Sequence, residues 1–191
     1  MKRKINFEKG SYYHVYNRGC NRGKIFRSKE NYRFLLRRVR EYLDEFHVTV
    51  IAYCFMPNHY HFLLRQNSEV TIGTFVQAVF NSYSKAFNKM YNRTGTLFES
   101  PFKSIHVADD DYLVHLCRYI HRNPLQAKLV SDLEKWEFSN YLEWINKRAG
   151  LLIDKEFVES FFKTANDYIA FVNDTQSVKD KKLLEKYLFD E

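Results

Sequence analysis

The sequence predicts an α+β domain, in which a four-stranded antiparallel sheet carries helices on one face in the ferredoxin-like β-α-β-β-α-β order. Three observations predict it. Two stretches rich in β-branched and aromatic residues flank a Pro-Asn turn, as in a hairpin. A stretch with helical periodicity lies on each side of this hairpin, and a strand-like stretch lies beyond each helix. Such a sheet leaves its second face available for a ligand.

The first half of this unit begins with "YYHVYNR", residues 12–18, which predicts a strand that ends at the glycines of "GCNRG". Ser28 is placed to cap a helix over 29–46, where apolar residues recur at helical spacing. The β-branched residues of 47–56 predict the second strand. "HYHFLLR", after the Pro-Asn turn, predicts the third.

The second half repeats the pattern of one helix and one strand. Residues 71–93 predict a long helix, and "FKSIHV", residues 102–107, predicts the fourth strand. Asp109 or Asp110 then caps a helix that we expect to end near residue 122, stopped by Pro124.

The chain shows no internal repeat and no clear second domain. We assign residues 1–150 to one domain and residues 151–191 to a C-terminal helical extension. Within the extension, "VKDKKLLEKYLFDE" predicts a polar helix at the end of the chain.

The composition is that of a basic, aromatic-rich globular protein, with a net charge of +7 and 17% aromatic residues. These features suit single-stranded nucleic acid, whose bases can stack, although a merely basic protein has the same charge. Three scattered cysteines form neither a disulfide pattern nor a zinc pattern, which fits a reducing cytoplasm. No stretch is apolar enough to predict a signal sequence or a membrane span.

His59 and His61 lie two residues apart in the predicted third strand, so their side chains project from one face of the sheet. Tyr60 and Phe62 point to the other face. Two neutral imidazoles on one face can bind a divalent metal ion. The alternative is a pair of half-buried structural histidines. The position directly after a turn, in a chain suited to nucleic acid, favours the metal.

The helix within "DDYLVHLCRYIHRNP" carries a second candidate cluster. Its core-facing stripe is Leu113, Leu116, Cys117 and Ile120. Tyr119 and Asn123 lie one turn apart beside that stripe, at the expected boundary between core and solvent. A tyrosine oxygen can attack phosphorus, and an amide oxygen can join two histidines at a metal ion. The alternative is a structural tyrosine and an asparagine that ends the helix.

Four segments, in this order, resemble the single-tyrosine HUH transposases, and in particular the REP-associated tyrosine transposases of bacteria: "YYHVYNRG", "AYCFMPNHYHFLL", "FKSIHV" and "CRYIHRNPLQAKLV". The resemblance covers about residues 8–145. It implies the HUH endonuclease fold, with His59 and His61 as ligands of Mg²⁺ or Mn²⁺ and Tyr119 as the nucleophile. Asn123 would complete the metal site, where some relatives carry glutamine.

The resemblance also implies an activity. Such enzymes cut single-stranded DNA beside a hairpin through a 5′-phosphotyrosine intermediate, and the free 3′-OH can rejoin DNA. We therefore expect a metal-dependent endonuclease and strand transferase, monomeric or homodimeric, in the bacterial cytoplasm in association with the nucleoid. Two alternatives stay open. One is a non-catalytic protein, derived from a transposase, that binds hairpin DNA or RNA, and the other is a phosphoesterase without a covalent step.

Several basic residues are candidate phosphate contacts, although solvated surface charge is the usual explanation for such residues. They are Arg18, Arg22, Lys24, Arg93, Lys103, Arg118 and Arg122, together with the N-terminal "MKRK". Where relatives carry a basic-aromatic string before the fourth strand, this chain has the less basic "FESPFKS". The other histidines near these motifs are expected on the surface of the sheet or a helix: His14, His106, His115 and His121.

Overall fold

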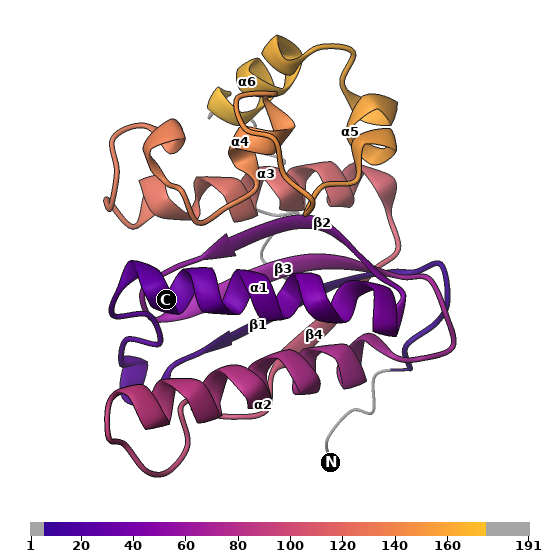
Figure 1. Cartoon of the computed structure of the whole chain (residues 1–191). Helices are drawn as coiled ribbons and strands as arrows, with labels where there is room; N and C mark the ends of the chain where they lie inside the picture. Colours follow the sequence, from indigo (N-terminus) through magenta and orange to yellow (C-terminus); the bar gives the residue numbers. More distant parts are fainter. Residues whose placement is uncertain (1–5, 175–191) are drawn as a thin grey trace.

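The computed structural model describes residues 6–174 (Figure 1). The basic "MKRK" and the terminal helix predicted from "VKDKKLLEKYLFDE" lie outside these residues. None of the helices within 6–174 is long and apolar enough to cross a membrane.

Four antiparallel strands form one sheet in the order β2-β3-β1-β4. They are β1 (Tyr12–Arg18), β2 (Val48–Phe55), β3 (His59–Gln66) and β4 (Lys103–Val107). At the hairpin turn between β2 and β3, the Met56 N–H donates to the His59 carbonyl at 2.9 Å. This is the ferredoxin-like arrangement that the sequence predicted, and the strand bounds agree closely with the prediction.

Two long helices, α1 (Lys29–Phe46) and α2 (Ile72–Met90), cover one face of the sheet (Figure 1). Ser28 is the N-cap of α1, and the Asn31 side-chain oxygen accepts from its N–H at 3.2 Å. The core beneath these helices is rich in aromatic rings. It takes Tyr60 and Phe62 from β3, which confirms the face predicted for both residues.

The second face of the sheet is covered as well, contrary to the expectation that it stays available. Helix α3 (Asp110–Gln126) lies across it, and the later helices pack around α3 (Figure 1). The predicted stripe of α3 is buried, because this face offers the apolar surface of Ile51, Ala52 and Leu63. The short elements are η1 (Cys20–Arg22), η2 (Leu133–Lys135), α4 (Tyr141–Trp144), α5 (Lys155–Phe161) and α6 (Ala165–Asn173).

Helix α3 also runs past Pro124, so the predicted end near residue 122 is wrong. Proline removes one N–H, but only the last turn of the helix follows it. That turn is closed by the Ala127 N–H, which donates to the Asn123 carbonyl at 2.9 Å. Asn123 therefore lies inside the helix, one full turn after Tyr119.

The described part of the C-terminal extension shares the core of α3. Phe157 of α5 and Tyr168 of α6 are buried in the same cluster as Leu116. The Arg118 guanidinium donates to the carbonyls of Phe171 and Asp174, each at 3.1 Å. These contacts attach the end of α6 to α3.

Candidate active site

The two histidines of β3 project from one face of the sheet, as their spacing predicted, and the structure shows that this face is the one that α3 covers. Their rings lie 5.2 Å apart, nearly perpendicular to each other. The His61 side chain is fully buried, whereas His59, at the start of the strand, is partly exposed. One imidazole therefore lies inside the cluster and the other at its partly exposed edge.

Asn123 connects α3 to this pair. Its side-chain nitrogen donates to the Tyr119 carbonyl at 2.9 Å, which directs its oxygen Oδ1 toward His59. The distance from Oδ1 to Nε2 of His59 is 3.4 Å. On the other side of the ring, Nδ1 of His59 is 2.8 Å from the Asn58 side-chain oxygen. Both of these amide oxygens only accept, and a neutral imidazole carries one proton, so His59 donates to only one of them and turns a lone pair toward the other.

Tyr119 lies against the same histidines. Its ring centroid is 5.5 Å from that of His61, in an edge-to-face arrangement. The side chain is 4% exposed and that of Asn123 is 2% exposed. Both are therefore more enclosed than the boundary position expected from the sequence, because α3 lies directly on the sheet.

His14 of β1 belongs to the cluster, and sequence reasoning missed it by expecting a surface position. It is fully buried, its ring stacks on that of His61 at 5.2 Å, and its Nε2 is 3.0 Å from Nδ1 of His61. The register pairs Tyr16 with His61, so the alternating residue His14 projects from the same face. The alternation was visible in the sequence, but the register between strands was not.

Burial keeps the three imidazoles neutral at pH 7. It lowers the pKa of His14 to about 3 and the pKa of His61 well below its usual value, with the neighbouring His14 and His59 adding to the second effect. The pKa of His59 is also lowered, chiefly by burial, while the hydrogen bond to Asn123 opposes the shift and Arg18 adds to it. Neutral imidazole is the form that ligates metal.

The donor set fits a divalent cation. Neighbouring ligands of an octahedral ion with bonds of about 2.1 Å lie about 3 Å apart, close to the separation of His59 Nε2 and Asn123 Oδ1. The bond between His61 and His14 resembles the outer hydrogen bond that orients most metal-binding histidines. Within residues 6–174, no group of three or more His, Cys, Asp or Glu residues is arranged to hold a metal. A metal site formed by His59 and His61 would therefore need the amide of Asn123.

The residues predicted to contact phosphate fall into two groups. The first group lies at or beside the end of the sheet that carries His59. Arg18 pairs with His59 across the strands, and its guanidinium bonds Glu99 at 2.6 Å. Lys103 of β4 is exposed, with its amine 5.9 Å from the Tyr16 ring. Arg22 and Lys24 are exposed in the loop after β1.

The remaining three candidates have partners away from the histidines. Arg93 follows α2 and bonds the Asn88 side chain at 3.2 Å. Arg118 is buried against α6, and Arg122 donates to the Val172 carbonyl at 2.5 Å. The structure therefore gives Arg118 and Arg122 a role in holding α6.

The other histidines divide between surface and core. His106 is exposed and His115 is partly exposed beside Arg118, 3.0 Å away. His121 is fully buried between Tyr168 and Asn140, so its predicted surface position is wrong. Burial lowers its pKa to about 4. Its partners, Tyr168 and Asn140, come from segments whose packing on α3 cannot be predicted from a local sequence pattern.

One comparison with a solved structure supports the fold. A REP-associated tyrosine transposase bound to a REP hairpin matches with a TM-score of 0.63 and 15% identity, over 81% of this chain and 94% of that chain. A protein of Deinococcus radiodurans R1 proposed to be a transposase gives 0.44 and 17%, over 64% and 97%. The tRNA(His) guanylyltransferase of Saccharomyces cerevisiae gives 0.47 and 8%, over 97% and 81%. No curated protein matches the sequence.

The family comparison carries the assignment. The model of the family described as "Transposase IS200 like" matches residues 8–123, which include the histidines of β3 and both Tyr119 and Asn123. This match agrees with the resemblance to single-tyrosine transposases seen in the sequence, and it spans more than half of the chain. The chain belongs to the IS200-like transposase family.

Proposed function

We propose that this transposase cuts and rejoins single-stranded DNA beside hairpins, with Tyr119 as the nucleophile and with Mg²⁺ or Mn²⁺ held by His59, His61 and Asn123. One observation carries the proposal. Two segments far apart in the sequence meet on one face of the sheet, with Nε2 of His59 3.4 Å from Oδ1 of Asn123 and the Tyr119 ring 5.5 Å from the His61 ring. A structural tyrosine alone would not require this convergence of metal-binding atoms.

The chemistry follows from these positions. When bound, the metal ion supplies positive charge to the phosphate oxygens, where negative charge increases during attack. The Tyr119 oxygen forms a bond to phosphorus and loses its proton, while the bond from phosphorus to the 3′ oxygen breaks and that oxygen gains a proton. The product is a 5′-phosphotyrosine and a free 3′-OH. Attack by a 3′-OH reverses these steps, so no energy-rich cofactor is consumed.

The hairpin substrate is supported by the fold and by charge. The solved relative with the same fold is bound to a REP hairpin. In this chain, Arg18, Arg22, Lys24 and Lys103 lie at or beside the sheet end that carries His59, where phosphate groups would pass. All four proposed site residues come from one chain, which supports a site that needs no second copy.

A second candidate is a hairpin-binding protein that does not cut. The observation that favours it is the enclosure of Tyr119, which is 4% exposed. In the first candidate, the DNA backbone must reach the enclosed tyrosine from the side of the partly exposed His59. The two candidates differ in one observable product, a covalent bond between protein and DNA.

The test is a denaturing gel of the protein with a pool of labelled hairpin oligonucleotides that carry single-stranded extensions, in Mn²⁺. Wild-type protein should give a protein-linked DNA band, and Tyr119→Phe should give none, because it lacks the attacking oxygen. Tyr112→Phe is the matched control, since this tyrosine lies two turns earlier on α3 and should keep the band.

The other outcomes choose between the alternatives. Cleavage that persists in Tyr119→Phe would indicate a phosphoesterase that uses water. DNA binding without any adduct, in protein shown to have bound Mn²⁺, would support the non-catalytic candidate.

A further inference from the structure

We propose that a pocket between α2 and the segment 98–102 holds one unpaired base of the DNA strand that passes the candidate active site. This inference rests on the proposed function, because its occupant belongs to that substrate. The pocket opens on the side of the sheet opposite to His59 and His61, and none of the proposed catalytic or metal-binding residues lines it.

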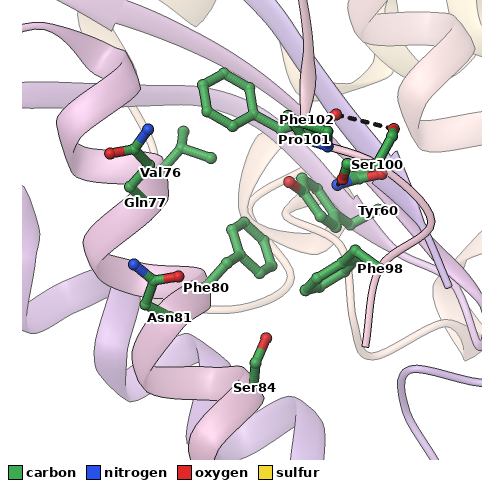
Figure 2. Close-up of a pocket in the computed structure, with 11 residues that line it drawn as sticks. Tyr60, Val76, Gln77, Phe80, Asn81, Ser84, Phe98, Ser100, Pro101 and Phe102 are labelled. Carbon is green, nitrogen blue, oxygen red and sulfur yellow. Dashed lines mark hydrogen bonds between the residues drawn. The ribbon is translucent and has the colours of Figure 1, made fainter. Parts of the chain in front are cut away.

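The pocket has aromatic walls. Its volume is about 350 Å³, at the small end of the range for small-molecule sites. The rings of Tyr60 and Phe80 stack at 4.0 Å, and Phe98 meets Phe80 edge to face at 5.4 Å (Figure 2). Phe98 and Phe102 are only partly buried. Partly exposed rings are the groups on which unpaired bases stack.

Polar groups without charge stand on the opposite wall. Gln77 and Asn81 lie one turn apart on α2, are exposed, and line the pocket (Figure 2). A carboxamide presents a donor and an acceptor side by side, which matches the edge of a nucleobase. Lys85, one turn further along the same face, is exposed and supplies a positive charge for the phosphate of such a nucleotide. An apolar peptide would leave these amides unpaired.

Strands β1 and β3 contribute residues both to the pocket and to the proposed cleavage site, so the two lie close together. Tyr60 lies between His59 and His61, and its ring points to the pocket while theirs point to α3. Asn17, also in the lining, precedes Arg18, which pairs with His59. A strand that follows the basic end of the sheet can therefore present one phosphate to Tyr119 and a nearby base to the pocket.

This position also accounts for the unusual string "FESPFKS". Its Phe98, Ser100, Pro101 and Phe102 form one wall of the pocket. Three bonds attach this wall to β1. The Asn17 amide donates to the Ser100 carbonyl at 2.9 Å, the Glu99 N–H donates to the Arg18 carbonyl at 3.1 Å, and the Arg18 guanidinium bonds the Glu99 carboxylate at 2.6 Å. A string that builds a base pocket needs aromatic and small residues more than basic ones.

The experiment is an abasic scan. A hairpin DNA with single-stranded extensions, selected from a random pool, is made in versions that each lack one unpaired base. Affinity is measured by fluorescence anisotropy with Tyr119→Phe protein, which cannot cut. At one position, loss of the base should weaken binding by about tenfold, the order expected for one stacked base.

Two pocket variants in the same background identify the position. One variant combines Gln77→Ala with Asn81→Ala, and the other is Ser84→Trp, whose larger side chain fills the pocket. Both variants should weaken binding of the intact DNA. They should also remove most of the loss of affinity caused by the missing base at that position, because the contact is already lost. Gln126→Ala is the matched control: an exposed glutamine at the end of α3, it should keep the full profile.

The outcomes separate this inference from the proposed function. If wild-type protein forms the adduct but the pocket variants keep the same abasic profile, the pocket assignment is wrong and the function stands. If no DNA of the pool binds, both are wrong. A base penalty that disappears in the pocket variants and persists in Gln126→Ala supports the pocket.

Discussion

At the scale of single residues, Asn123 decides whether α3 contributes to a metal site. Its amide makes two contacts, one to the Tyr119 carbonyl and one to Nε2 of His59. The hydrogen bond to the Tyr119 carbonyl orients the amide so that its oxygen faces His59. A side chain held in this way presents its oxygen without the loss of conformational entropy that a mobile ligand would incur on binding.

We predict that Asn123→Ala lowers Mn²⁺ affinity by about tenfold or more, because it removes one of the three proposed ligands. Asn123→Asp should bind Mn²⁺ at least as well as wild type, since hard divalent cations prefer carboxylate oxygen. Isothermal titration calorimetry of the metal-free proteins gives both values. His106→Ala, an exposed histidine on β4, is the control. Equal affinities in wild type and Asn123→Ala would show that Asn123 is no ligand.

At the scale of elements, α3 connects the candidate active site to the C-terminal extension. The same helix bears Tyr119 toward the sheet and Arg118 toward α6. The Arg118 guanidinium lies 4.3 Å from the centre of the Phe171 ring and bonds two carbonyls near the end of α6. The extension thus holds the tyrosine helix from its outer side.

We predict that Arg118→Ala lowers the free energy of unfolding by about 2 kcal/mol, because it removes the hydrogen bonds of a charged donor to two carbonyls of the α6 end and the packing of the guanidinium on the Phe171 ring. Arg33→Ala, an exposed arginine of α1, should change it by less than about 0.5 kcal/mol. Urea denaturation measures both. If Arg118 instead contacts DNA, its variant would unfold like wild type and would lower the salt dependence of DNA binding by about one unit of slope.

At the scale of the whole molecule, we expect the charge of +7 to act mainly along the proposed path of the DNA. Arg18, at the end of β1, and Lys103, at the start of β4, lie at the end of the sheet that carries His59. The exposed Lys135 belongs to a different segment, η2, which packs against α3 through Leu133.

We predict that Lys103→Ala reduces the slope of log affinity against log salt by about 0.7–0.9 for a hairpin DNA with single-stranded extensions, one counterion fewer being released. Lys135→Ala should leave the slope unchanged. Anisotropy titrations over a range of salt concentrations measure it. Equal slopes for Lys103→Ala and wild type would exclude a phosphate contact at Lys103.

Most of the secondary structure could be predicted because its signals are local. Helical periodicity marked α1 and α2, the Pro-Asn turn marked the hairpin, and the alternation along β3 placed His59 and His61 on one face. The spacing of Tyr119 and Asn123 followed in the same way from the pitch of a helix. The end of α3 was wrong because packing against the sheet outweighs the cost of a proline in the last turn.

The sequence by itself therefore determined the order of the elements, the fold class and the four residues proposed for the site. Only the tertiary structure decided how these segments meet. It placed His14 against His61 through the register of β1 and β3, laid α3 over the second face, and formed the aromatic pocket beneath Tyr60. The physical reason is range: periodicity and capping involve residues within a turn or two, whereas register and packing depend on surfaces that adjoin only after folding.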